Sequence, residues 1–334
     1  MEKLLEVNNL KTYFHLDEGT VKAVDGVDFD IYKGKTLGIV GESGCGKSVT
    51  SQSVMRIVPS PPGEIMDGEI LYHQGDKIID IAQLKANSRE MRALRGSEIA
   101  MIFQEPMNSF SPVHTIGSQI IEAIRLHQNL SKDEAREKAI SLLDKVRIPR
   151  PAEIVDEYPH QLSGGMRQRA MIALALSCEP ALLIADEPTT ALDVTVQAQI
   201  LELINDLQED MGMGMMLITH DLGVVAQTAD YVAVVYLGRV VEHGSIEDVF
   251  NNPLHPYTRA LFASIPKLEG NDKLNPIRGS VPDPFTVIHG CPFKDRCDQY
   301  IEGECDKEVP PLIEVEPEHQ ARCVLYKEGG RRDG

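Results

Sequence analysis

The sequence contains no tryptophan, and aromatic residues make up only 5 % of its 334 positions. It also lacks any apolar run close to the roughly 18 residues that a membrane-spanning helix needs. The longest candidate, residues 170–178, is far too short. The N-terminus, residues 1–3, shows no pattern of a secretory signal. We therefore expect a cytosolic chain that is linked to a membrane only through a partner.

Positive charge is scarce. The chain has 33 Lys and Arg against 51 Asp and Glu, which gives a formal net charge of −18 at pH 7. A nucleic-acid-binding surface needs a basic stripe, so we expect no nucleic acid among the main partners. Direct adhesion to anionic lipid is disfavoured for the same reason. A nucleotide pocket needs positive charge only locally, so the composition leaves ATP binding open.

Cysteines are few, six in all, and unevenly placed. Four of them fall within residues 291–323: Cys291, Cys297, Cys305 and Cys323. In a reducing cytosol such a group is more often metal-binding than disulfide-bonded. Four thiolates suit zinc or a [4Fe–4S] cluster, and the wide, irregular spacing favours the cluster because structural zinc usually uses close pairs. Zinc, unliganded thiols and disulfides remain alternatives.

One stretch follows the phosphate-binding pattern G-x-x-x-x-G-K-[ST] without substitution. It reads Gly41-Glu42-Ser43-Gly44-Cys45-Gly46-Lys47-Ser48. An apolar run at 37–40 precedes it and an expected helix, Val49–Val58, follows, which is the context that the motif needs. Glycines let backbone N–H groups converge on an anion, and the helix N-terminus adds positive potential. Lys47 can reach the outer phosphates, and the Ser48 hydroxyl can ligate Mg²⁺. An ordinary glycine turn before a helix is the weaker interpretation.

Alternating and continuous apolar runs predict an α/β fold with a parallel sheet. Strands are expected at 4–10, 24–31, 68–72, 77–81, 98–103, 181–185 and 215–219, with a hairpin at 231–242. Helices are expected within 115–176, including 135–146 and 166–177, and at 195–210 and 257–264. Ser131 and Glu134 form a capping-box pattern ahead of one of them. After Phe250 the composition becomes rich in proline, which indicates a domain boundary near 250.

Polar residues follow two of the expected strands. Asp186 and Glu187 come directly after the run at 181–185, and His220 follows the run at 215–219. Ligands of open parallel sheets bind at the carboxyl ends of strands, so these groups should converge with the phosphate loop. Asp186 can hold Mg²⁺ through water, Glu187 can polarise a water for attack on the γ-phosphate, and His220 can steady that water. A solvated turn and an ordinary loop histidine are the alternatives.

Tyr13 and Phe14 stand ahead of the phosphate loop in a chain with few aromatic residues. A role in stacking on the base and a role in the core at the sheet edge are equally supported by this stretch.

Further motifs carry a resemblance. The stretch Leu162-Ser163-Gly164-Gly165-Met166-Arg167-Gln168 resembles the signature motif of ATP-binding-cassette (ABC) proteins. Gln104 resembles that family's Q-loop glutamine, and Ala191-Leu192-Asp193 is similar to its D-loop. His220 is similar to its switch histidine. The motifs occur in the family's order across residues 1–250.

The resemblance implies a P-loop NTPase core with an antiparallel β subdomain and a helical subdomain at about 105–178. It implies dimers that sandwich two ATP molecules, with Ser163 and Gly165 touching the γ-phosphate held by the other subunit. Phe14 would stack on adenine, with Tyr13 as runner-up. The implied catalytic residues are Lys47, Gln104, Glu187 and His220, and the implied Mg²⁺ ligands are Ser48, Gln104 and Asp186. The remaining nucleotide-binding residues would be Gly41, Ser43, Gly44, Cys45, Gly46, Val49, Gly164 and Asp193.

Residues 252–261, and the cysteine segment that begins at Gly290 and includes Arg296, look like the C-terminal region of dipeptide/oligopeptide importer ATPases. The implied C-terminal domain, 251–334, is small, irregular, cysteine-rich and metal-binding, with the four late cysteines on a [4Fe–4S] cluster or, alternatively, zinc. The implied chain hydrolyses ATP at the cytoplasmic face of the membrane, as a peripheral subunit that powers peptide import. Residues 157–161 lie where the family contacts the permease.

The implied partners are a second ATPase subunit, two membrane permeases and an extracytoplasmic binding protein. One alternative is a soluble ABC ATPase of DNA repair or chromosome maintenance. Another is an importer for nickel or a different small solute, and a third makes the cysteine domain an electron carrier.

Overall fold

The computed structural model describes residues 1–104, 109–190, 192–264 and 277–326. The chain divides into two compact units, each built from several stretches. The first contains Met1–Leu4, Ile31–Thr36 and Leu84–Ile218, and the second contains Leu5–Asp30, Leu37–Gln83 and Thr219–Gly334. The domain boundary near residue 250 stays a prediction.

Parallel strands form the buried sheet of the first unit. They are β6 (Ile99–Ile102), β7 (Leu182–Asp186) and β8 (Gly214–Ile218), in the order β6-β7-β8. Ile99 pairs with Leu182, which in turn pairs with Gly214. All residues of these strands are buried. Continuous apolar runs predicted them because a strand covered on both faces has no polar face.

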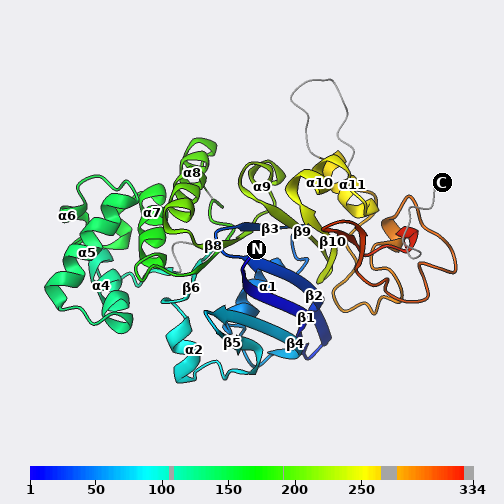
Figure 1. Cartoon of the computed structure of the whole chain (residues 1–334), viewed down its shortest axis with the longest axis horizontal. Coiled ribbons are helices and arrows are strands. Elements are labelled where there is room, and N and C mark those ends of the chain that lie inside the picture. Colours follow the sequence, from blue (N-terminus) through cyan, green and yellow to red (C-terminus); the bar gives the residue numbers. More distant parts are fainter. Residues whose placement is uncertain (105–108, 191, 265–276, 327–334) are drawn as a thin grey trace. The chain divides into compact units, whose positions relative to one another are not determined.

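The helices of the first unit are α2 (Arg89–Leu94), α4 (Ile116–His127), α5 (Lys132–Lys145), α6 (Pro151–Ile154), α7 (Gly164–Ala175) and α8 (Val194–Met211). Helices α4, α5 and α7 pack against one another (green in Figure 1). The capping box ahead of α5 is confirmed, since Ser131 Oγ accepts from Glu134 N (3.3 Å) and Glu134 Oε2 accepts from Ser131 N (2.8 Å). Within the described residues, no helix has the length and apolar character needed to cross a membrane.

Most of an antiparallel sheet lies in the second unit. It consists of β1 (Lys3–Leu16), β2 (Gly19–Tyr32), β4 (Gly63–Gln74) and β5 (Lys77–Asp80), in the order β2-β1-β4-β5. Both β1 and β5 run antiparallel to β4. Strands β1 and β2 extend beyond their predicted ranges, 4–10 and 24–31.

The second unit also carries the strand that leads into the phosphate loop. This strand, β3 (Thr36–Val40), lies parallel to β9 (Tyr231–Tyr236), and β9 pairs with β10 (Arg239–Ser245), as the predicted hairpin requires. Two short strands continue the pairing, β12 (His319–Ala321) and β11 (Ile313–Glu316). The helices of this unit are α1 (Lys47–Val54), α9 (Leu222–Thr228), α10 (Ile246–Asn251) and α11 (Pro256–Ala263).

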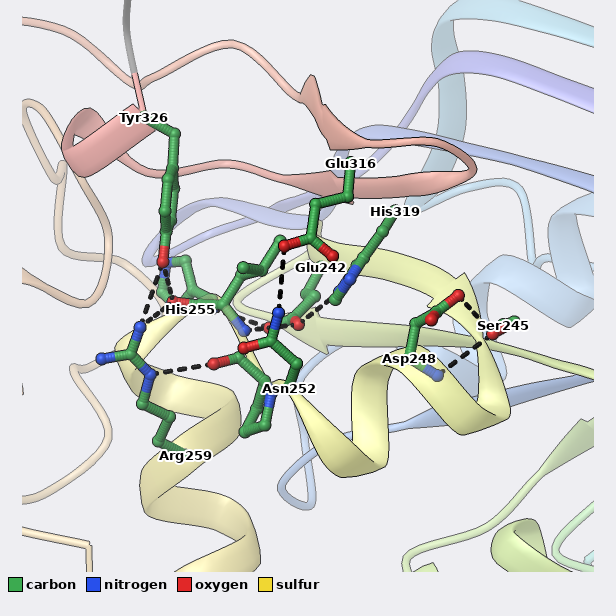
Figure 2. A network of polar contacts seen from close by, with 11 residues as sticks. Glu242, Ser245, Asp248, Asn252, His255, Arg259, Glu316, His319 and Tyr326 are labelled. Atoms are coloured by element: carbon green, nitrogen blue, oxygen red, sulfur yellow. Dashed lines mark hydrogen bonds and ion pairs between the residues drawn. The ribbon is translucent and has the colours of Figure 1, made fainter. Parts of the chain in front are cut away.

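A buried polar network connects β10 to the C-terminal region, by which we mean the chain from residue 251 onward. The Glu242 carboxylate is fully buried and accepts from Leu254 N (2.7 Å), His255 N (2.8 Å) and His319 Nε2 (2.9 Å). At the margin of the network, Asn252 Nδ2 donates to Glu316 Oε1 (3.1 Å), as Figure 2 shows. A buried carboxylate is stable only when donors satisfy it, so this network fixes the segment between α10 and α11 against the sheet.

Candidate functional site

The phosphate loop, residues 41–48, connects β3 to α1 in the second unit. Helix α1 begins at Lys47, two residues earlier than predicted, and ends at Val54, with Met55 as its C-cap. Arg56 then has a positive φ of 52°, which turns the chain out of the helix well before Pro59. Ser43 and Gly44 are exposed, while Val49 and Ser48 are half-buried. The strand–loop–helix arrangement that the motif needs is therefore present.

Two glycines of this loop lie against backbone carbonyls. A Cβ on Gly46 would stand 2.1 Å from Ala23 O, and one on Gly41 would stand 2.2 Å from Val235 O. Gly46 also has φ +102°, in the region that favours glycine. These positions let the loop bend tightly toward a bound anion, as the glycines of a phosphate cradle must.

The Lys47 side chain folds back over the loop. Its Nζ donates to Gly41 O (2.8 Å) and Glu42 O (3.1 Å), and the residue is only 5 % exposed. This places one positive charge inside the curve of the loop, where phosphate oxygens would need it.

Cys45 packs inside the loop as a small buried side chain. It is 4 % exposed, its Sγ lies 3.9 Å from Lys47 Nζ, and burial raises the pKa of its thiol. A buried thiol of raised pKa is a poor nucleophile, so Cys45 serves packing.

The two aromatic candidates lie on β1. The Tyr13 hydroxyl donates to Asp25 Oδ1 (2.6 Å), and Lys22 Nζ lies 5.5 Å from the ring centroid. Burial, followed by the bond to Asp25, raises the pKa of Tyr13. Phe14 pairs with Gly63 on β4, and both aromatic residues are half-buried. The choice between them for adenine stacking stays a prediction.

In the first unit, the structure brings two predicted residues into direct contact. Gln104 Nε2 donates to Glu187 Oε2 (2.8 Å), which also accepts from Thr190 Oγ1 (2.9 Å). Asp186 is the last residue of β7 and is buried. Glu187 has a φ of +46°, unusual for a residue with a side chain, and its N–H donates to Ile218 O (2.8 Å). The carboxylate of Glu187 is thus held in a defined place just beyond the sheet.

The signature stretch opens helix α7. Ser163 is its N-cap, with Oγ accepting from Met166 N (3.3 Å), and Ser163 and Gly164 are exposed. Gly165, the next residue, is half-buried. Gln168, one turn on, donates to Pro188 O and so ties the helix to the turn after β7. The exposed N-terminus of a helix that begins with two glycines is suited to bind an anion.

The remaining motif residues lie at helix starts. Asp193 caps α8 through Oδ1, which accepts from Val196 N (2.9 Å). Ala191, the first residue of the expected D-loop, lies outside the described residues. His220 belongs to the second unit, is exposed, and directly precedes Asp221, the N-cap of α9. The roles expected for Asp193 and His220 stay predictions.

The four late cysteines line one small cavity of about 10 Å³, together with His255 and Phe293. This is room for about one water-sized sphere. All six cysteines of the chain are free thiols. Burial raises the pKa of Cys297 to about 11 and that of Cys323 to about 12. Across the described ranges no set of three or more His, Cys, Asp or Glu side chains is arranged to hold a metal ion, so the metal-binding part of the expected fold is not shown.

Comparison with known families agrees with the motifs. The family model described as ABC transporter matches residues 24–190. The model described as oligopeptide/dipeptide transporter, C-terminal region, matches residues 241–305. The chain belongs to the ABC transporter family. The expected resemblance and the expected enzyme class, an ABC-type ATPase, are confirmed.

Relatives in the ABC family match along nearly the whole chain. The oligopeptide transport ATP-binding protein AppD of Bacillus subtilis (strain 168) is 52 % identical over 331 residues, which cover 99 % of each chain. The dipeptide transport ATP-binding protein DppD of the same organism is 51 % identical over 326 residues, covering 97 % of this chain and 95 % of that protein. These matches do not favour the DNA-repair alternative.

Among solved ABC structures, the chain resembles the dimeric post-hydrolysis state of the ATP-binding cassette MJ0796 bound to ADP and Pi. The TM-score is 0.63 at 25 % identity, and the match covers 73 % of this chain and 99 % of that one. The P-loop fold of the ABC class, with its mixed α/β content, is thereby confirmed.

The surroundings of Glu42, the second residue of the phosphate loop, were not predicted from the sequence. Its N–H donates to the Tyr257 hydroxyl (2.9 Å), and its carboxylate accepts from both Nη atoms of Arg296 (2.7 and 3.0 Å). Tyr257 and Arg296 lie in the two stretches that resemble peptide importers, but contacts over 215 and 254 positions of sequence leave no local pattern.

The close approach of Gly46 to a carbonyl makes a direct prediction. Gly46→Ala should weaken ATP binding at least about 100-fold, because the added Cβ forces the loop away from Ala23. Titration with a fluorescent ATP analogue measures this. Gly75→Ala is the matched control, since Gly75 also has a positive φ (+59°) but, apart from its chain neighbours, no described residue lies within 4 Å of its Cβ position. Equal affinities of the two variants would contradict the prediction.

Proposed function

We propose that this chain is the ATP-hydrolysing subunit that powers import of dipeptides or oligopeptides through a membrane ABC transporter. The observation that carries the proposal is the glycine-bent phosphate loop, curved around Lys47. Within the other unit, the Glu187 carboxylate is held by Gln104, which supports the same function. The names of the relatives, oligopeptide and dipeptide transport ATP-binding proteins, support peptides as the cargo. Nickel or another small solute is the less supported cargo.

In the proposed reaction, the loop binds the triphosphate and Lys47 contacts its outer phosphates. Ser48, Gln104 and Asp186 would hold Mg²⁺, which neutralises charge that develops on the phosphates. Glu187 orients and polarises the attacking water, and His220 contacts the γ-phosphate. The fixed position of Glu187 supports its role, because a water-positioning group must be held before the substrate arrives.

The proposed catalytic unit is a dimer. Ser163 and Gly165 would contact the γ-phosphate bound by the other subunit, and Gly164 and Asp193 would be further nucleotide-binding residues. The open N-terminus of α7 supports this, because exposed N–H groups attract an anion. The similar structure of MJ0796 is that of a dimer bound to ADP and Pi. The second subunit is either a copy of this chain or a relative.

We also propose that residues 157–161 contact one of two permease subunits, which places the chain peripherally at the cytoplasmic face of the membrane. Tyr158 is 39 % exposed and stacks on His160 with ring centroids 5.6 Å apart. An exposed stacked pair offers a rigid surface to a partner helix. An extracytoplasmic binding protein would deliver the peptide to the permeases.

The finer assignment of the four cysteines is a [4Fe–4S] cluster, with zinc as the alternative. The convergence of thiols from separate segments on one cavity with apolar walls supports a metal there. The cavity is small, so a cluster requires the thiols to move apart. When bound, the metal would supply a structural cross-link between the segments that carry the four cysteines.

The proposed role of Glu187 predicts a sharp loss of turnover. Glu187→Gln should still bind ATP but hydrolyse it at least about 100-fold more slowly, because an amide cannot accept a proton from water. A phosphate-release assay and nucleotide titration measure the two quantities. Glu202→Gln, on the exposed face of α8, is the control and should keep normal turnover. Turnover of Glu187→Gln near that of the control would remove Glu187 from the mechanism.

A [4Fe–4S] cluster on the four cysteines predicts a characteristic absorption spectrum and iron content. Chain purified without oxygen should show a broad absorption band near 400 nm and about four irons per chain, and Cys297→Ser should lower both. One zinc per chain without the absorption band would show that the metal is zinc. A chain that contains neither iron nor zinc would contradict the proposal. Cys178→Ser is the control, because Cys178 is a half-buried thiol of the first unit and lies outside the cysteine cavity.

A further inference from the structure

Each backbone and side-chain polar group of Glu42 has a partner within the second unit. Its N–H donates to the Tyr257 hydroxyl, and its carbonyl oxygen accepts from Lys47 Nζ and from Cys45 N (3.3 Å). Its carboxylate forms a two-point ion pair with Arg296 (2.7 and 3.0 Å). Two of these partners come from the C-terminal region, so that region fixes one residue of the phosphate loop.

Arg296 is itself held firmly. Its Nε donates to Arg278 O (2.9 Å) and its Nη1 to the Tyr236 hydroxyl (3.3 Å). The guanidinium lies 5.8 Å from the ring centroids of both Tyr236 and Phe293. Its side chain is 5 % exposed, against 25 % for Glu42. A guanidinium fixed in this way presents both N–H groups to a carboxylate with little loss of side-chain freedom.

The backbone of Tyr257 is fixed by His255, a member of the buried network around Glu242. Glu242 accepts from the N–H of His255, two residues that Figure 2 shows. Nδ1 of His255 in turn accepts from Tyr257 N (3.0 Å) at the start of α11. The ring of Tyr257 is fully buried, with centroid distances of 4.7 Å to Tyr236 and 5.3 Å to Phe293. The position of its ring is therefore set by residues outside the phosphate loop.

The charge of Glu42 explains why such a support is needed. A carboxylate in the loop that receives a triphosphate repels it, and this repulsion is strong where water is partly excluded. Arg296 cancels the negative charge and keeps the carboxylate in one orientation.

We propose that Arg296 and Tyr257 are positioning residues of the ATP site, through which the C-terminal region sets the affinity for ATP. Arg296 neutralises Glu42 and directs its side chain, and Tyr257 fixes the backbone of the same residue. Neither residue acts on the reacting atoms, so they affect binding of ATP and leave the hydrolytic step itself unchanged. The family region at 241–305, which contains both residues, is then a part of the nucleotide site and more than an appendage.

Charge cancellation can be separated from simple structural support by a rescue experiment. Arg296→Gln should raise the Kd and KM for ATP about tenfold, with kcat changed less than about twofold, because Glu42 is left unpaired beside the phosphates. Adding Glu42→Gln to this variant should restore KM to within about threefold of the wild type, since the repelling charge is gone. Steady-state hydrolysis and nucleotide titration measure both.

Arg322→Gln is the matched control. Arg322 is another buried arginine of the C-terminal region, which donates to Val240 O (2.8 Å) and to Asp28 Oδ2 (3.3 Å), neither of which belongs to the loop. It should leave KM unchanged. An unchanged KM for Arg296→Gln, a failure of Glu42→Gln to rescue it, or an equal rise for Arg322→Gln would each overturn the proposal.

If Arg296→Gln does not fold, Glu42→Gln alone keeps the test open. It should bind ATP at least as tightly as the wild type, because Arg296 then adds an uncompensated positive charge, and a more than fivefold weaker Kd would overturn the proposal. The inference rests on the proposed ATP site. A wild-type chain that binds no ATP would refute that site, whereas normal wild-type binding without rescue refutes only the role of Arg296.

Discussion

Two positions without a side chain determine the shape of the phosphate loop. Gly41 and Gly46 lie so close to the carbonyls of Val235 and Ala23 that a single carbon atom would not fit at either place. The loop therefore packs closely against β2 and β9, which carry these two carbonyls. Lys47 Nζ donates to carbonyls of the loop itself. The phosphate chemistry of the chain depends on this close packing, because a wider turn would not direct backbone N–H groups to one anion.

Charge is balanced locally around this loop, although the whole chain has a formal net charge of −18 at pH 7. Lys47 supplies one positive group inside the curve, and Arg296 pairs with the acidic side chain of Glu42. The rings of Tyr236 and Phe293 lie beside the guanidinium, and Phe293 also contacts Tyr257 and lines the cysteine cavity. The C-terminal region thus packs against the phosphate loop inside one compact unit, while Glu187, which is expected to polarise the attacking water, belongs to the other unit.

Much of this could be predicted from the sequence where local patterns carry the information. Strands β7 and β8 were predicted within one residue at each end, because continuous apolar runs have few other uses in a chain of this kind. The phosphate loop and the capping box of α5 are likewise set by neighbouring residues.

Other features could not be predicted because distant contacts decide them. Strands β11 and β12 are short and partly polar, and they are defined by pairing, of β12 with β10 and of β11 with β12. Helix α1 ends at Val54 although Pro59 suggested a later end. The pair formed by Glu42 and Arg296 joins residues that no local pattern connects. The spacing of the late cysteines did indicate a common site, and they do share a cavity, but spacing alone does not say what fills it.

We infer that the triphosphate lies in the loop of one subunit and is capped by the start of α7 from another. A crystal structure of the Glu187→Gln chain with ATP and Mg²⁺ tests this most directly. We expect two nucleotides between two subunits, each with its γ-phosphate near Lys47 of one subunit and near Ser163 and Gly165 of the other. A nucleotide bound away from residues 41–48, or one left open to solvent beside an unpaired subunit, would contradict the account.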